Sequence, residues 1–168
     1  LSSRPQLIAL GEADRWDDGM VFGTGWVDVG DEWWFYYSGY DGPHGDPASR
    51  QPGIGLATIK KERLISLHGP RDGGVVITRK LRWQGERLFL NADASQGEIK
   101  VRISDGKRKV LEGFDYEDCV PLHADSLHHE VKWNNKSMAA LQGEVIRLEI
   151  YLRDADLFTF QAGTETAE

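Results

Sequence analysis

The chain has 168 residues, of which 40% are hydrophobic, and a formal net charge of −7. This length suits one domain, or one domain with a small appendage, and it can bury a core without disulfides. The acidic balance argues against a nucleic-acid binder, which needs a basic surface to neutralise phosphates. No apolar run approaches the ~20 residues of a membrane span. We therefore expect neither nucleic acid nor a membrane as a partner.

Cysteine content and the start of the chain leave the localisation open. The single cysteine, Cys119, rules out an intrachain disulfide. This fits a reducing compartment and is also compatible with secretion, so bacterial cytoplasmic and secreted locations both remain. The first residues do not have the composition of a signal peptide. Because the chain begins with Leu1 rather than Met, we expect a processed protein or a piece of a longer one.

The first part of the chain is aromatic, acidic and rich in loops. Gly30-Asp31 is a tight-turn signal between two β-prone runs, and residues 39–53 have the proline and glycine content of a loop. Strands are expected at residues 20–29, 32–38, 54–59 and 64–67.

The second of these runs contains five consecutive aromatic residues. Strand alternation places Trp33, Phe35 and Tyr37 on one face and Trp34 and Tyr36 on the other. A strand that is aromatic on both faces is expected to be covered on both. We predict that three or four of the five are core residues and that Trp33 or Trp34 is exposed.

After about residue 70 the strands become aliphatic and regular. In residues 97–104 and 144–152, apolar side chains alternate with polar ones, which is typical of half-solvated antiparallel strands. Strands are expected at residues 75–83, 87–94, 97–104, 128–133, 144–152 and 156–160, with one helical turn at 136–142. The fold class is therefore all-β, an antiparallel β-sandwich of jelly-roll or lectin-like type. The expected organisation is a blade-like β segment at 1–69, the sandwich at 70–162 and a disordered tail at 163–168.

The motifs RWDDGMVFGTG, DEWWFYYSGYDGPHG and GIGLATIKKERLISL resemble the last blade of a five-bladed β-propeller glycosidase. The remaining motifs, among them LFLNADAS and LQGEVIRLEIYLRDADLFTF, resemble the C-terminal β-sandwich that follows such a propeller. The resemblance covers nearly the whole chain and points to bacterial glycosidase-like proteins related to the fructan-hydrolase and arabinanase-like clans. It implies a saccharide partner. Because one blade cannot hold a complete catalytic pocket, it implies no catalytic residue in this chain and no activity of the chain by itself.

Two acidic residues follow a tryptophan at Trp16-Asp17-Asp18. Glycosidic chemistry needs two carboxylates that flank the scissile bond. Adjacent carboxylates on a strand point to opposite faces, so Asp17 and Asp18 cannot form that pair by themselves. One of them can hydrogen-bond a sugar hydroxyl, or both can serve as turn and cap residues before Gly19.

The remaining candidate saccharide contacts come from the aromatic strand and the loop after it. Indole and phenol rings stack on the apolar faces of sugars, which makes Trp33, Trp34 and Tyr40 candidates. Asp41 and His44 lie in the loop, where they can hydrogen-bond hydroxyls or simply be solvated.

Metal and thiol chemistry have weaker sequence support. Asp41 and Asp46 with loop carbonyls can hold calcium, but their spacing does not match an EF-hand, and no cofactor is otherwise expected. Cys119 with His128 and His129 lacks any metal-binding or catalytic spacing, so we interpret Cys119 as a small buried residue of the sandwich.

Three functions remain open from the sequence. The first is a carbohydrate-associated module, the C-terminal part of a glycoside-hydrolase-like protein, which supports or completes a sugar site. The second is a free-standing carbohydrate-binding module, and the third is a structural interdomain module without a ligand. For the first we expect the missing propeller blades or a self-associating sheet edge as partners.

Overall fold

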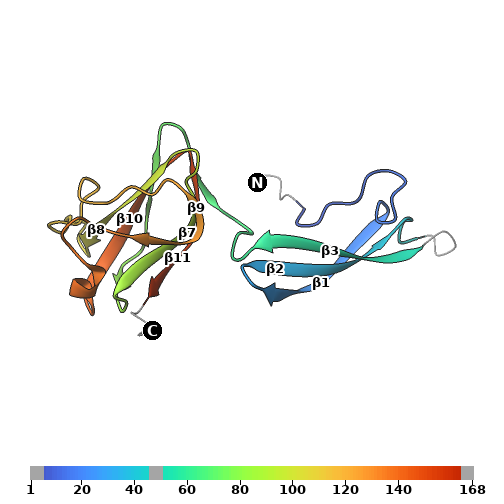
Figure 1. Ribbon diagram of the computed structural model, residues 1–168, viewed down its shortest axis with the longest axis horizontal. Helices are drawn as coiled ribbons and strands as arrows, with labels where there is room; N and C mark the ends of the chain where they lie inside the picture. Colours follow the sequence, from blue (N-terminus) through green and yellow to red (C-terminus); the bar gives the residue numbers. More distant parts are fainter. Residues whose placement is uncertain (1–5, 46–50, 164–168) are drawn as a thin grey trace. The chain divides into compact units, whose positions relative to one another are not determined.

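The chain is all-β and antiparallel throughout, as its computed structural model shows for residues 6–45 and 51–163 (Figure 1). This confirms the fold class predicted from the sequence. Two compact units are present, Leu1–Leu64 and Ile65–Glu168. Within the described ranges, no helical segment has the length and hydropathy needed to cross a bilayer.

The first unit contains one three-stranded sheet. Its strands are β1 (Met20–Val29), β2 (Glu32–Tyr40) and β3 (Pro52–Lys60), in that order. Gly30 has φ of +55°, a conformation that favours glycine, and it closes the predicted tight turn between β1 and β2. A register shift between Gly23 and Gly25 adds a bulge to β1. Both β1 and β3 are edge strands of this sheet.

The aromatic strand β2 is less covered than its composition suggests. Of the five consecutive aromatics only Phe35 is buried, whereas Trp33, Trp34 and Tyr37 are half-buried. Tyr36 is 45% exposed. The prediction that both faces are covered, with an exposed Trp33 or Trp34, is therefore wrong, because few groups of this unit lie against the face that carries Tyr36.

That face has an apolar surface of its own. Directly paired residues of antiparallel strands point to the same side, and the register pairs Tyr36 with Leu56, Trp34 with Val27 and Ser38 with Phe22 and Ile54. We call the surface formed by the exposed side chains of Phe22, Val27, Tyr36, Ile54 and Leu56 the Tyr36 face.

The second unit is built from two four-stranded antiparallel sheets. One sheet contains β5 (Gly74–Ile77), β6 (Leu81–Arg82), β8 (Glu98–Asp105) and β10 (Val145–Arg153). The other contains β4 (Leu67–Gly69), β7 (Arg87–Asp93), β9 (Asp125–Val131) and β11 (Ala155–Gly163). In the first sheet β10 is central, with β8 along one edge and β5 then β6 along the other.

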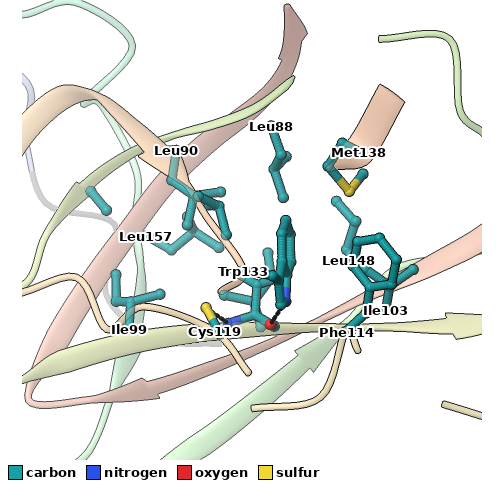
Figure 2. Packing of buried hydrophobic residues seen from close by; sticks show 14 of the residues in the cluster. Leu88, Leu90, Ile99, Ile103, Phe114, Cys119, Trp133, Met138, Leu148 and Leu157 are labelled. Carbon is teal, nitrogen blue, oxygen red and sulfur yellow. Dashed lines mark hydrogen bonds between the residues drawn. The ribbon is translucent and has the colours of Figure 1, made fainter. Parts of the chain in front are cut away.

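The core of the second unit lies between its two sheets. Figure 2 shows Leu88 and Leu157 from one sheet packed with Ile99 and Leu148 from the other. The inward-facing residues predicted from alternation are confirmed as buried, namely Ile99, Val101, Ile103, Ile146, Leu148, Ile150 and Leu152. Trp133 spans this core, and its Nε1 donates to the carbonyl oxygen of Val101 at 3.0 Å. Buried polar groups need such partners, so this hydrogen bond orients the indole.

Local features of the second unit follow from single side chains. The run 75–83, predicted as one strand, is broken into β5 and β6 at Thr78, whose Oγ1 accepts from the backbone N–H of Leu148 at 3.0 Å. The strand predicted at 64–67 begins only at Leu67. The predicted helical turn is the 3₁₀ turn η1 (Met138–Leu141), capped by Ser137, whose side chain accepts from the N–H of Ala139. The predicted tail lies outside the described residues, except for Gly163, which ends β11.

One carboxylate is buried on the side of β10 that faces away from the core. Glu149 is 1% exposed and accepts from Arg102 Nε and Nη2 at 2.9 and 2.8 Å and from Ser104 Oγ at 2.7 Å. Arg102 also lies 4.7 Å from the centre of the Tyr116 ring. Burial alone would raise the pKa of Glu149, but the hydrogen bonds from Ser104 and Arg102 and the charge of Arg102 outweigh burial and lower it.

Candidate functional site

The eight predicted site residues all belong to the first unit, and the structure separates them into three groups. Trp16, Asp17 and Asp18 lie in the segment before β1, at the end of the sheet where β2 finishes. Trp16 stacks on Tyr37, with ring centroids 5.8 Å apart and planes 17° from parallel. An added Cβ at Gly39 or Gly53 would approach the indole to 2.5 or 2.3 Å. These two strand glycines therefore form the flat surface on which Trp16 lies.

Asp17 is held beneath this tryptophan. It is a buried carboxylate, and Tyr37 donates its phenol hydroxyl to Oδ2 at 3.0 Å. Burial, followed by the hydrogen bond to Asp17, raises the pKa of Tyr37. Trp16 itself keeps 38% of its surface exposed. The arrangement joins a partly open indole, a phenol and a fixed acceptor, which are the groups that contact sugar rings and hydroxyls.

Asp18 has a local structural role. Its Oδ2 accepts from the backbone N–H of Asp14 at 2.7 Å, and its own N–H donates to Arg15 at 3.2 Å. These contacts cap the turns that precede β1. Asp17 and Asp18 thus serve different purposes, and they do not form a carboxylate pair across a common ligand.

The second group lies where β2 ends, on the opposite side of the sheet from Trp16, because Tyr37 and Tyr40 are three positions apart. Tyr40 meets Phe22 edge to face at 6.1 Å, and His44 lies 6.3 Å from the same ring. Asp41 Oδ1 accepts from the N–H of Gln51 at 2.7 Å, which ties the two ends of the loop together. Asp41 is therefore a loop-closing residue, and Tyr40 and His44 flank Phe22.

Trp33 and Trp34 form no common site with the others. Trp33 and Trp34 precede Tyr40 by seven and six residues along β2, about 20 Å away or more at the usual rise of a strand. Trp33 packs against Trp26 at 5.3 Å, and Trp34 Nε1 donates to Glu32 Oε2 at 2.9 Å. The opposite faces of the strand carry these two indoles, so they cannot stack on one sugar ring together.

Three residues of these clusters were not singled out from the sequence. Tyr37 was interpreted as part of an aromatic run, although it binds Asp17, and Phe22 and Trp26 lie in β1 among other β-prone residues. A usable signal for the Trp16 cluster was present, because Gly39, Gly53 and Gly55 interrupt two strands. Glycine inside a strand often marks the close approach of another group. Here Trp16 covers the first two and Tyr37 covers the third.

The metal interpretation has little structural support. Asp46, one of the two suggested calcium ligands, lies outside the described residues. Among residues 6–45 and 51–163 no group of three or more histidine, cysteine or acidic side chains is arranged to hold a metal ion. Cys119 is buried, and burial raises the pKa of its thiol, so its environment is that of a core residue.

The fold and the candidate site together define the class of protein to which this chain belongs. The class is an all-β protein in which a three-stranded antiparallel sheet with an aromatic cluster precedes a β-sandwich. In comparisons with known proteins, no family model, curated protein or solved structure matches this chain.

Proposed function

We propose that this chain is a carbohydrate-associated module, the C-terminal part of a glycoside-hydrolase-like protein, whose first unit supports or completes a saccharide site. The observation that carries the proposal is the Trp16 cluster. Its indole is partly exposed and stacked on Tyr37, and Asp17 is fixed beside it by a 3.0 Å hydrogen bond. A flat ring next to a held acceptor is the combination that binds the apolar face and the hydroxyls of a sugar.

The Trp16 cluster is better suited to bind part of a substrate than to form a complete catalytic site. Hydrolysis of a glycoside requires two carboxylates on either side of the bond, about 5–10 Å apart. Asp17 is committed to Tyr37, and Asp18 is committed to the N–H of Asp14. We therefore assign no catalytic residue here and expect binding or orientation of substrate from this unit.

The Tyr36 face supports the proposal that the first unit packs against a further sheet. Its most exposed residue, Ile54, is 82% exposed, and four more exposed apolar side chains share the face. Contiguous exposed apolar patches of this kind mark interaction surfaces. A sheet of the same kind, supplied by further propeller blades or by a second copy, would remove this surface from water.

Affinity electrophoresis in gels that contain fructan or arabinan tests the saccharide proposal. We expect retention of the wild type, and a loss of at least tenfold in affinity for Trp16→Ala, equivalent to about 1.4 kcal/mol. Trp34→Phe at the other end of β2 is the matched control and should be retained like the wild type. If Trp16→Ala and the wild type migrate alike in every polysaccharide, the Trp16 cluster is not the sugar contact.

A free-standing carbohydrate-binding module is the second candidate, favoured by Trp26. This indole is 55% exposed and lies against Trp33, so it offers an aromatic surface at the opposite end of the sheet. Loss of retention on Trp26→Ala, with Trp16→Ala unaffected, would select this alternative. Absence of retention on a broad glycan array would leave the purely structural module.

A further inference from the structure

The second unit contains a hollow that includes none of the residues discussed as saccharide contacts. Its volume is about 520 Å³, within the range of roughly 300–1,000 Å³ found for small-ligand sites. It lies where β7 begins and β9 ends, beside η1. The side chains that matter to its chemistry are Arg87, Glu130, Lys132, Trp133, Lys136 and Met138. We call it the cationic hollow.

The apolar lining of the cationic hollow is part of the rigid core. Trp133 and Met138 are 5% and 2% exposed, and both belong to the cluster in Figure 2. The hydrogen bond from Trp133 Nε1 to Val101 fixes the indole. A ligand here would therefore meet a surface that is already ordered, which reduces the entropy lost on binding.

Lys136 is held at the rim by the local backbone. Trp133 and Lys136 form a β-bridge across a turn, so the lysine returns next to the tryptophan. Its methylene stem packs over Gly113, where an added Cβ would come within 2.7 Å of Lys136 Cγ. Gly113 also has φ of +78°, which side-chain-bearing residues rarely adopt. The bridge to Trp133 and the contact with Gly113 thus fix the position of this lysine.

The charges around the cationic hollow are not balanced. Glu130 lies within ion-pair distance of both Lys132 Nζ at 3.1 Å and Arg87 Nε at 3.8 Å. Lys136 makes no ion pair within residues 6–45 and 51–163. With Glu86 also in the lining, three cations stand against two carboxylates. An excess of positive charge is notable in a chain whose net charge is −7, and it would attract an anionic ligand.

We propose that the cationic hollow binds a short anionic saccharide, in which Lys132 and Lys136 pair with the carboxylate of a uronic-acid residue. Trp133 and Met138 form the buried floor beneath the ligand, and the lysines select the acidic sugar over a neutral one. The carbohydrate class rests on the proposed function, whereas the charge selection rests on the cationic hollow alone. The residues of this site and those of the Trp16 cluster belong to different units of the chain.

Titration calorimetry of the full chain with trigalacturonate, and with its methyl-esterified neutral form, tests the proposal. We expect the acidic trimer to bind at least tenfold more tightly than the neutral one and to weaken as salt is added. The double variant Lys132→Gln with Lys136→Gln should lower affinity for the acidic trimer at least tenfold. Lys107→Gln with Lys109→Gln, another exposed pair in the same unit, is the matched control and should bind like the wild type. All four lysines are exposed, so the variants should keep the melting temperature of the wild type.

Each alternative result overturns a defined part of the proposal. Equal affinity for the acidic and neutral trimers, or an unchanged affinity in the Lys132/Lys136 variant, refutes charge selection at the cationic hollow. Competition by citrate at the same affinity as trigalacturonate refutes saccharide recognition. Trp16→Ala should leave trigalacturonate binding intact, so failure of the first-unit site and failure of this one give different results.

Discussion

Replacement of Glu149 by glutamine tests whether its charge, rather than its shape, stabilises the second unit. Glutamine has nearly the same volume, so packing is kept while the carboxylate charge is lost. The two hydrogen bonds from Arg102 then lose the charge of the acceptor and keep only that of the guanidinium, and the hydrogen bond with Ser104 becomes neutral. In addition, one amide oxygen must replace two carboxylate oxygens; if it faces Arg102, the amide NH₂ faces Ser104, whose hydroxyl must turn from donor to acceptor.

The expected cost follows from these three contacts. Hydrogen bonds to charged groups are worth about 1.5–3 kcal/mol each and neutral ones about 1 kcal/mol. The Arg102 side chain is 32% exposed, so water moderates its loss. We expect Glu149→Gln to lower the free energy of unfolding by about 2–3 kcal/mol at pH 7. Glu144→Gln, an exposed carboxylate just before β10, is the control and should stay within about 0.5 kcal/mol.

The effect must also depend on pH. The folded protein lowers the pKa of Glu149 below its ordinary value of 4.5, so the stabilisation is complete above that value. It is lost as the pH falls through the lowered pKa, where Glu149 becomes protonated and resembles glutamine. Urea denaturation gives the difference in free energy of unfolding between the wild type and Glu149→Gln at each pH. Hydrogen exchange of the β8 and β10 amides shows whether the loss of stability is located in these two strands. A difference below about 0.5 kcal/mol at pH 7, or one that does not shrink in acid, would refute the reasoning.

The other predictions concern the two units separately. Gly53→Ala forces a Cβ to 2.3 Å from the Trp16 ring and should destabilise the first unit by about 1–3 kcal/mol in thermal denaturation, whereas Gly25→Ala, with open space around it, should not. Cys119 should react with a thiol reagent only as fast as the second unit opens, because burial protects it and raises its pKa; rapid labelling of the folded chain would contradict its burial. Sedimentation should show self-association that Ile54→Glu abolishes, and a wild type that is monomeric at every concentration would argue against a self-docking Tyr36 face.

Much of the fold is readable from strand alternation. The inward residues of β8 and β10 follow from period-two patterns, because each strand has one face on the core. Glu149 shows the limit of that pattern. Alternation places it outward, yet Arg102 and Ser104 on the neighbouring strand cover it, and strand register is a long-range property that composition does not encode.

The candidate site was less predictable for the same reason. The motif made Trp16 and Asp17 candidate saccharide contacts, but their partner Tyr37 lies 20 residues later than Asp17 in the sequence. Its role depends on how β2 meets the segment before β1. The opposite error occurred for Tyr36, since five aromatic residues in a row suggested a covered strand. A strand face is buried only when another layer of the structure packs against it, and the sequence of the strand alone does not show whether such a layer exists.

The distribution of buried residues connects the stability of the two units to their proposed functions. Among the described residues, the apolar side chains buried in the first unit are Met20 and Phe35, whereas the core cluster of the second unit has 20 members. A three-stranded sheet with so small a core and two free edges is marginal by itself. On the proposed function, a further sheet or a saccharide would cover its exposed aromatic side chains. The second unit has the opposite balance, because its 20-member core is buried and the lysines beside the cationic hollow, Lys132 and Lys136, are exposed. The first unit should therefore gain order when it binds, and the second should bind without changing.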